Sequence, residues 1–132
     1  MGRDLRRERH SVTSLIVHLI CVTKYRRSIL TAEGLNTIED SFRAVAKSLN
    51  CKLLEFNGEA NHVHACIEYP PKLSVSKLAN AFKGTSSRRY GQAGYPKPSS
   101  KALWSPSYFA SSIGGAPLED LKRYIQNQEK PS

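Results

Sequence analysis

Two histidines, one residue apart, are the first candidates for chemistry in this sequence. His62 and His64 flank Val63 in the run HVHACIEY. Side chains alternate along a β-strand, so a strand here would place both imidazoles on one face and Val63 on the other. Two imidazoles on one face suit a divalent transition metal. On this short motif alone, a pair of structural or surface histidines is the better explanation.

A tyrosine and a glutamine four residues apart form a second candidate half-site. Tyr124 and Gln128 would share one face of a helix. The amide oxygen of glutamine is a suitable ligand for Mg²⁺ or Mn²⁺, and the phenol of tyrosine can attack phosphorus. The ordinary alternative is a half-buried tyrosine beside a solvated glutamine on a surface helix.

Together, the two half-sites would suffice for metal-assisted DNA strand transfer. We expect Mg²⁺ or Mn²⁺ at His62, His64 and Gln128 to polarise the scissile phosphate and stabilise the leaving 3′ oxygen. Tyr124 would become linked to the 5′ phosphate, and this bond would preserve the energy for rejoining without a nucleotide cofactor. Because only neutral imidazoles ligate metals, activity should fall below about pH 6.5.

Strands and helices must position these groups. Apolar, β-branched runs predict strands over residues 11–23, 51–56, 62–69 and 108–113. Helical periodicity predicts helices over residues 31–50 and 74–90, and a last helix from about residue 117. Asn57-Gly58 predicts the turn between the second and third strands. This order indicates a ferredoxin-like α+β fold: an antiparallel sheet, helices on one face, and an added C-terminal helix that carries the tyrosine.

The 132 residues fit a single domain, which we place at 11–132 after a loose basic arm at 1–10. His18 lies in a strand that looks too apolar for a ligand site, so we expect a buried histidine there. Trp104 is expected in the core. The three cysteines form no C-x-x-C pair and are expected to be buried free thiols. The first helix has a predicted buried stripe made of Leu35, Ile38, Phe42, Val45 and Leu49.

The charge balance favours a nucleic-acid partner. Twenty Lys and Arg oppose eleven Asp and Glu, giving a net charge of +9. A general solubility charge is the alternative. There is no signal peptide and no apolar run of about 20 residues, so we expect a cytoplasmic protein without membrane partners. Phosphate contacts and base stacking are predicted for Lys24, Tyr25, Arg26, Arg27, Lys83, Arg88, Arg89 and Tyr90.

Five segments carry a resemblance to a known family. They are HLICVTKYRR (18–27), NHVHACIE (61–68), KGTSSRRY (83–90), LWSPSYFASSIGGAPL (103–118) and YIQNQ (124–128). In these segments the chain resembles the HUH-type, single-tyrosine insertion-sequence transposases, often called TnpA. The resemblance extends from about residue 11 to 130, and the segment at 103–118 is the most specific.

The resemblance implies a site and its partners. It makes His62 and His64 the paired metal ligands of the family, Tyr124 its nucleophile and Gln128 its third ligand. It implies a prokaryotic, nucleoid-associated protein that binds single-stranded DNA with hairpin ends. It also implies a homodimer in which the tyrosine helix of one subunit serves the histidines of the other. The sequence ends four residues after Gln128, earlier than many relatives, which leaves open which subunit supplies the tyrosine.

Two other functions are compatible with the sequence. A domesticated relative, or a nickase of the replication-initiation or relaxase type, would use the same metal and tyrosine chemistry. Transposon ends next to the gene would distinguish a mobile element from these. A ferredoxin-like module that binds single strands through sheet aromatics would not cleave DNA. Few aromatic residues lie on the predicted strands.

Overall fold

The computed structural model describes residues 15–112, which form four strands, two α-helices and one 3-10 helix. The predicted arm at 1–10 and the predicted last helix, with Tyr124 and Gln128, lie outside the described residues. The strands are β1 (Leu15–Val22), β2 (Lys52–Glu59), β3 (His62–Tyr69) and β4 (Phe109–Ser112). The helices are η2 (Lys24–Arg26), α1 (Ala32–Ser48) and α2 (Val75–Gln92).

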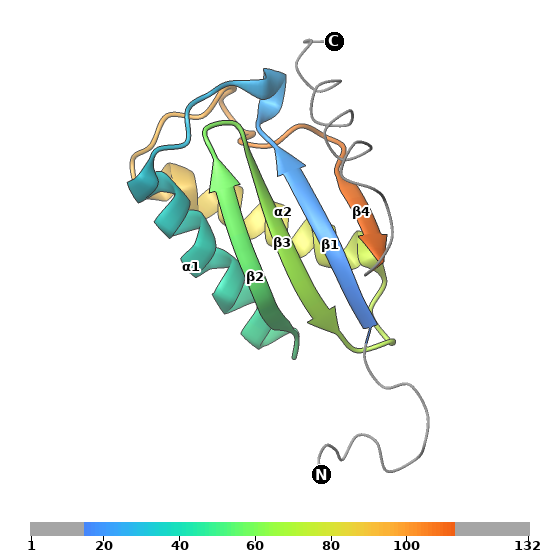
Figure 1. Ribbon diagram of the computed structural model, residues 1–132. Coiled ribbons are helices and arrows are strands. Elements are labelled where there is room, and N and C mark those ends of the chain that lie inside the picture. Colours follow the sequence, from blue (N-terminus) through green and yellow to red (C-terminus); the bar gives the residue numbers. More distant parts are fainter. Residues whose placement is uncertain (1–14, 113–132) are drawn as a thin grey trace, which may run out of the picture.

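The four strands form one antiparallel sheet in the order β2-β3-β1-β4 (Figure 1). Strand β3 lies between β2 and β1, and β1 lies between β3 and β4. Each helix therefore connects two parallel strands that have another strand between them, which is the split β-α-β arrangement of ferredoxin-like folds. The predicted α+β class is confirmed for the described residues.

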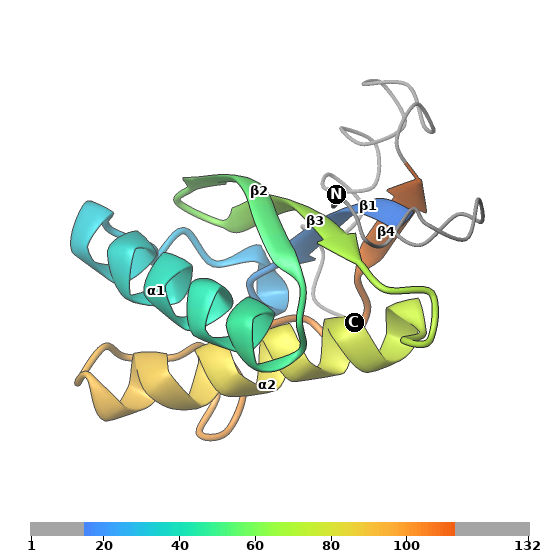
Figure 2. The same cartoon turned by 90° about the horizontal axis from the view of Figure 1, so that it is seen from below.

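Both helices cover the same face of the sheet (Figure 2). The core lies between them and the sheet, where the ring of Phe42 from α1 contacts Phe82 from α2 at a centroid distance of 4.9 Å. The predicted stripe of α1 is confirmed: its three central residues are buried, and Leu35 and Leu49 are half-buried against the core. This packing leaves the other face of the sheet free of α1 and α2.

Each α-helix begins at a hydroxyl side chain. Thr31 Oγ1 accepts a hydrogen bond from the backbone N–H of Gly34 at 3.1 Å, and Ser74 Oγ accepts one from Lys77 at 3.1 Å. These bonds satisfy amide groups that have no partner within the helix. The two starting points were both predicted from the sequence.

The hairpin between β2 and β3 is confirmed, but the predicted turn at Asn57-Gly58 is wrong. Those residues belong to β2, which continues to Glu59, and the turn lies at residues 60–61. Gly58 pairs with Val63, and a Cβ atom at Gly58 would lie 2.5 Å from Leu35 Cδ2. The glycine thus permits the close approach of α1 to the sheet rather than a turn.

The predicted burial of the three cysteines and of Trp104 is confirmed. The three cysteines are free and buried, and burial raises the pKa of Cys21 to about 12. Trp104 is buried, and its Nε1–H donates a hydrogen bond to Ser86 Oγ at 2.9 Å. Among residues 15–112, no helix combines the length and the hydrophobicity that crossing a membrane requires.

Candidate functional site

The two histidines of β3 lie on the face of the sheet that α1 and α2 leave uncovered. Val63 is fully buried, whereas the His62 and His64 side chains are half-buried. This difference follows from the alternation of side chains along a strand. The predicted sharing of one face by the two imidazoles is therefore confirmed.

Acidic residues of the neighbouring strand share this face. Glu59 of β2 pairs with His62, and Glu55 pairs with Cys66, two positions beyond His64. Directly paired residues in an antiparallel sheet project to the same side. The imidazoles of β3 therefore lie beside a row of carboxylates that favours positive charge.

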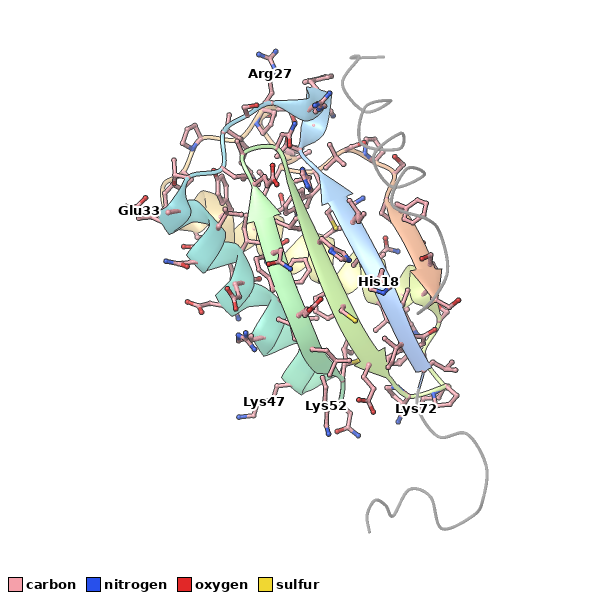
Figure 3. The ribbon with its side chains drawn as sticks, in the orientation of Figure 1. His18, Arg27, Glu33, Lys47, Lys52 and Lys72 are labelled. Carbon is pink, nitrogen blue, oxygen red and sulfur yellow. The ribbon has the colours of Figure 1, made fainter. Side chains whose placement is uncertain are left out.

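His18 of β1 contacts the same site. It has a hydrogen-bond partner, as expected, but the expectation that it is buried is wrong. Its Nδ1 atom lies 2.9 Å from His64 Nε2, and its side chain is half-buried. The prediction failed because apolar residues occupy both faces of β1, so the sequence does not show which side chains point to which face. Val17 and Leu19 face the helices, and His18 faces the open side. We call His18, His62 and His64 the histidine cluster; Figure 3 labels His18 on β1.

Asn61 orients the first imidazole of β3. Its Oδ1 atom lies 2.8 Å from His62 Nδ1, so the ring nitrogen donates to the amide oxygen. This bond leaves the lone pair of a neutral ring on Nε2. Metal-binding histidines commonly use their second nitrogen in this way. Asn61 was part of the resembling segment NHVHACIE, but its type alone gave no reason to assign it a role.

Burial outweighs the neighbouring carboxylates and favours the neutral form of the two imidazoles of β3. Burial is the main cause that lowers the pKa of His62, and Glu59 opposes it. Burial also lowers the pKa of His64, with a further lowering by His18. Neutral imidazoles can ligate a cation, so His62 and His64 fit two positions of a metal site.

The described residues do not form a complete metal site by themselves. Within residues 15–112, no group of three or more His, Cys, Asp and Glu side chains is placed to hold an ion. A metal site that uses His62 and His64 therefore needs a further ligand, either of another residue type or from another segment. Gln128, the predicted third ligand, lies outside the described residues.

A basic segment follows β1 at the His62 end of the sheet. The backbone N–H of Thr23 donates to the carbonyl of Asn61 at 3.0 Å, which brings η2 next to the β2–β3 turn. Tyr25 is exposed, and Lys24 Nζ and Arg27 Cζ lie 5.6 and 5.8 Å from its ring centroid. An exposed ring between cations is suited to unpaired bases and phosphates.

Two of the residues predicted to contact DNA have other roles. The Lys83 ammonium group donates to the carbonyls of Ser105, Pro106 and Ser107 at 2.8, 3.1 and 3.0 Å, which uses all three of its donors. Tyr90 is buried and stacks on Tyr95, so its ring is not available to bases. The predictions of DNA contacts for these two residues are wrong.

The remaining predicted DNA contacts stay predictions. Arg88 and Arg89 have exposed side chains on α2, and Lys24 and Arg26 are half-buried at η2. The two groups lie close to each other, because Leu103 bonds to both elements: its N–H donates to Ser87 Oγ of α2 at 3.1 Å, and its carbonyl accepts from the N–H of Lys24 at 2.9 Å.

The sequence comparisons identify relatives along most of the chain. The family described as Transposase IS200 like matches residues 11–128. The ISDra2 transposase TnpA of Deinococcus radiodurans is 28% identical over 129 residues, which is 95% of this chain and 91% of that protein. The transposase for insertion sequence element IS200 of Salmonella typhimurium is 29% identical over 115 residues, covering 84% of this chain and 74% of that protein.

Solved structures share the fold. A crystal structure of a candidate transposase from Deinococcus radiodurans R1 matches with a TM-score of 0.78 and 26% identity, covering 91% of this chain and 95% of that one. The REP-associated tyrosine transposase bound to a REP hairpin matches with a TM-score of 0.57 and 14% identity, covering 86% and 64%. With its paired imidazoles on the open face of a ferredoxin-like sheet, and with the family match over residues 11–128, this chain belongs to the IS200-like transposase family.

Proposed function

We propose that this transposase cuts and rejoins single-stranded DNA, with Tyr124 as the nucleophile and a divalent cation at His62, His64 and Gln128. The observation that carries the proposal is the placement of two neutral, half-buried imidazoles on one face of β3 in a member of this family. Mg²⁺ or Mn²⁺ bound there would polarise the scissile phosphate and stabilise charge on the leaving 3′ oxygen.

The protein groups have separate tasks in this reaction. Asn61 and His18 orient the rings of His62 and His64 through contacts of 2.8 and 2.9 Å. The oxygen of Tyr124 would form a bond to phosphorus while the bond from phosphorus to the 3′ oxygen breaks. The phenol proton leaves to solvent, and the released 3′ oxygen takes up a proton. Reversal of these steps with a different 3′ hydroxyl would rejoin the strands.

The proposed substrate is single-stranded DNA that carries hairpins at the element ends. The net charge of +9 supports a polyanionic partner, and η2 places Lys24, Tyr25 and Arg27 at the His62 end of the sheet. A solved structure of the same fold, the REP-associated tyrosine transposase, is bound to a REP hairpin, which is consistent with this substrate class. The family match favours this function over a binding module without catalysis.

The change of Tyr124→Phe tests the nucleophile. The variant should bind a labelled DNA hairpin as the unchanged chain does, but form no covalent protein–DNA adduct on denaturing gels. Tyr95→Phe is a matched control, because it removes a phenol hydroxyl from a ring that packs on Tyr90. An adduct that persists in Tyr124→Phe would exclude Tyr124 from this role.

Removal of divalent metal tests the second half of the site. EDTA should abolish adduct formation while hairpin binding persists, and Mg²⁺ or Mn²⁺ should restore the adduct. His64→Ala should respond to neither ion, because an imidazole ligand is missing. Full cleavage by the unchanged chain in EDTA would contradict a metal-dependent mechanism.

We also propose that the protein acts as a homodimer in which one subunit supplies the tyrosine to the histidines of the other. A mixture of Tyr124→Phe and His64→Ala tests this arrangement, because each variant alone lacks one half of the site. Adduct formed only by the mixture would support exchange between subunits. An inactive mixture of chains that do form mixed dimers would instead assign both halves to one subunit.

A further inference from the structure

The part of the chain around α2 contains no carboxylate side chain. Between Glu68 and Glu119 the sequence has no Asp or Glu. Within residues 15–112, all acidic residues belong to α1, β2 and β3. The cations of the acid-free part are Lys72, Lys77, Lys83, Arg88, Arg89, Lys97 and Lys101. Among the described residues, the net positive charge is therefore concentrated on α2 and the loop that follows it.

This loop folds back along α2 and forms a cavity with it. The cavity has a volume of about 410 Å³ and opens to solvent. An adjoining cavity of about 180 Å³ shares three of its lining residues, Gly84, Ser87 and Lys101. We call the larger space the α2 cavity; its lining consists of Gly84, Ser87, Arg88, Lys97, Ser100 and Lys101. Three cations and two hydroxyl groups thus converge in a lining that contains no acid.

Hydrogen bonds hold the loop in position around the α2 cavity. Lys83 on α2 donates to three consecutive loop carbonyls. Ser87 Oγ accepts from the backbone N–H of Leu103 at 3.1 Å, and its carbonyl accepts from Lys97 Nζ at 3.2 Å. Two of the lining residues, Ser87 and Lys97, are therefore held in place before a ligand enters, which lowers the entropic cost of binding.

Gly84 keeps one side of the α2 cavity open. A Cβ atom built at this position would have no atom within 4 Å. Glycine in the middle of a helix is less favourable than alanine, and no close approach in the described residues accounts for it here. The residue is therefore also a suitable place at which to add a side chain without disturbing the fold.

We propose that the α2 cavity binds backbone phosphates of the DNA hairpin stem. This inference rests on the proposed function, because it takes DNA as the partner. Cations and hydroxyl groups are the usual phosphate contacts, and they fix the position of DNA without reading its sequence. Helix α2 covers one face of the sheet (Figure 2), and the histidine cluster lies on the other face, as the burial of Val63 and the pairing of β1 with β3 indicate. This contact would therefore anchor the DNA away from the reacting phosphate.

The decisive comparison is between Gly84→Glu and Gly84→Gln. The two side chains have nearly the same size, but only glutamate adds a negative charge to the α2 cavity. Gly84→Glu should weaken binding of a labelled DNA hairpin roughly tenfold at moderate salt, whereas Gly84→Gln should differ from the unchanged chain much less. The dependence of log K on log salt should become shallower by about 0.9 for each phosphate that the protein no longer neutralises.

Removal of single cations gives a second, independent measurement. Lys101→Gln should weaken hairpin binding and reduce its salt dependence, because Lys101 lines both cavities. Lys47→Gln is the matched control: it removes the same charge from an exposed position on α1 (Figure 3). The decrease in affinity should also be larger for the hairpin than for a linear strand of the same composition, since the proposed ligand is the stem.

The proposal would be overturned if Gly84→Glu, Lys101→Gln and Lys47→Gln bound the hairpin alike while circular dichroism showed them folded. Equal decreases in affinity for hairpin and linear DNA would overturn the assignment to the stem. The proposed chemistry is tested separately. If the unchanged chain forms no tyrosine adduct, the role of Tyr124 is contradicted, but the binding measurements on the α2 cavity variants still test the phosphate site.

Discussion

His18 and His64 form a direct contact between the two central strands, with Nδ1 of the first 2.9 Å from Nε2 of the second. The ring centroids lie 5.1 Å apart, and the ring planes differ by 23°. The two imidazoles thus meet through one shared proton, which requires that at least one ring be neutral. The contact restrains the ring of a predicted metal ligand before any metal binds.

The first prediction concerns His18→Ala, which should raise the pKa of His64. Burial and His18 both lower this pKa, and the substitution weakens both causes. The measurement is a titration of the imidazole resonances by NMR in metal-free protein. His62 is an internal control, because burial, Glu59 and Arg26 determine its shift. An unchanged pKa of His64 would show that the contact has no electrostatic consequence.

The second prediction concerns stability and pH in metal-free protein. The pKa values of His62 and His64 are lowered from 6.5 in the folded state. Below pH 6.5 the unfolded chain therefore binds protons that the folded chain does not, and the free energy of unfolding decreases. This stability is fully present above pH 6.5 and is lost progressively as the pH falls below it.

Urea denaturation between pH 7.5 and 5.5, in EDTA, measures this effect. The double variant His62→Gln and His64→Gln should show a smaller dependence on pH over the same range, because two of the groups that cause it are absent. A variant whose stability fell as steeply as that of the unchanged chain would place the cause in other groups. The same lowered pKa values should keep cleavage active somewhat below pH 6.5, the limit expected for unperturbed imidazoles.

The third prediction concerns Lys83→Met, which should destabilise the fold. Three carbonyl groups would lose a charged donor, and hydrogen bonds to charged groups contribute about 1.5–3 kcal/mol each at most. We expect a decrease of about 2 kcal/mol in the free energy of unfolding by urea, because the exposed carbonyls of residues 106 and 107 regain water. Lys77→Met, an exposed change on the same helix, should stay within about 0.5 kcal/mol.

A small effect of Lys83→Met on stability, together with a large decrease in DNA affinity, would contradict this structural role. It would return Lys83 to the group of phosphate contacts.

The fourth prediction separates stability from DNA binding at Tyr25. This residue has a left-handed backbone with φ of 60°. Tyr25→Gly relieves a strain of about 1–2 kcal/mol, while the flexibility of glycine in the unfolded chain offsets about half of that. Stability should therefore change little. Affinity for single-stranded DNA should fall roughly tenfold, since one stacked base contributes about 1–3 kcal/mol.

Tyr25→Phe is the matched control for this change, because it retains the ring and removes only the hydroxyl. It should bind single-stranded DNA nearly as the unchanged chain does. Equal affinities of Tyr25→Gly and the unchanged chain would mean that the exposed ring does not stack on bases.

The local features of the fold could be predicted from the sequence because their causes are local. The alternation in HVHACIEY placed His62 and His64 on one face, and the structure has that strand at His62–Tyr69 as predicted. Thr31 marked a helix start because its hydroxyl group can satisfy the first amides of the helix, and the apolar positions after Ser74 marked the other start. The order of strands and helices then led to a ferredoxin-like sheet, which is confirmed.

Only the tertiary structure decided which distant residues meet. His18 joined the site because β1 pairs with β3 in a register that no local pattern contains. Gly58 belongs to a strand rather than a turn because β2 pairs with β3 as far as Glu59, and Leu35 of α1 leaves no room there for a side chain. Lys83 and Tyr90 were predicted from the sequence to contact DNA. In the structure, the Lys83 ammonium group donates to loop carbonyls, and the ring of Tyr90 is buried in the core. Composition and periodicity record a residue's own preferences, whereas pairing register and burial depend on partners far along the chain.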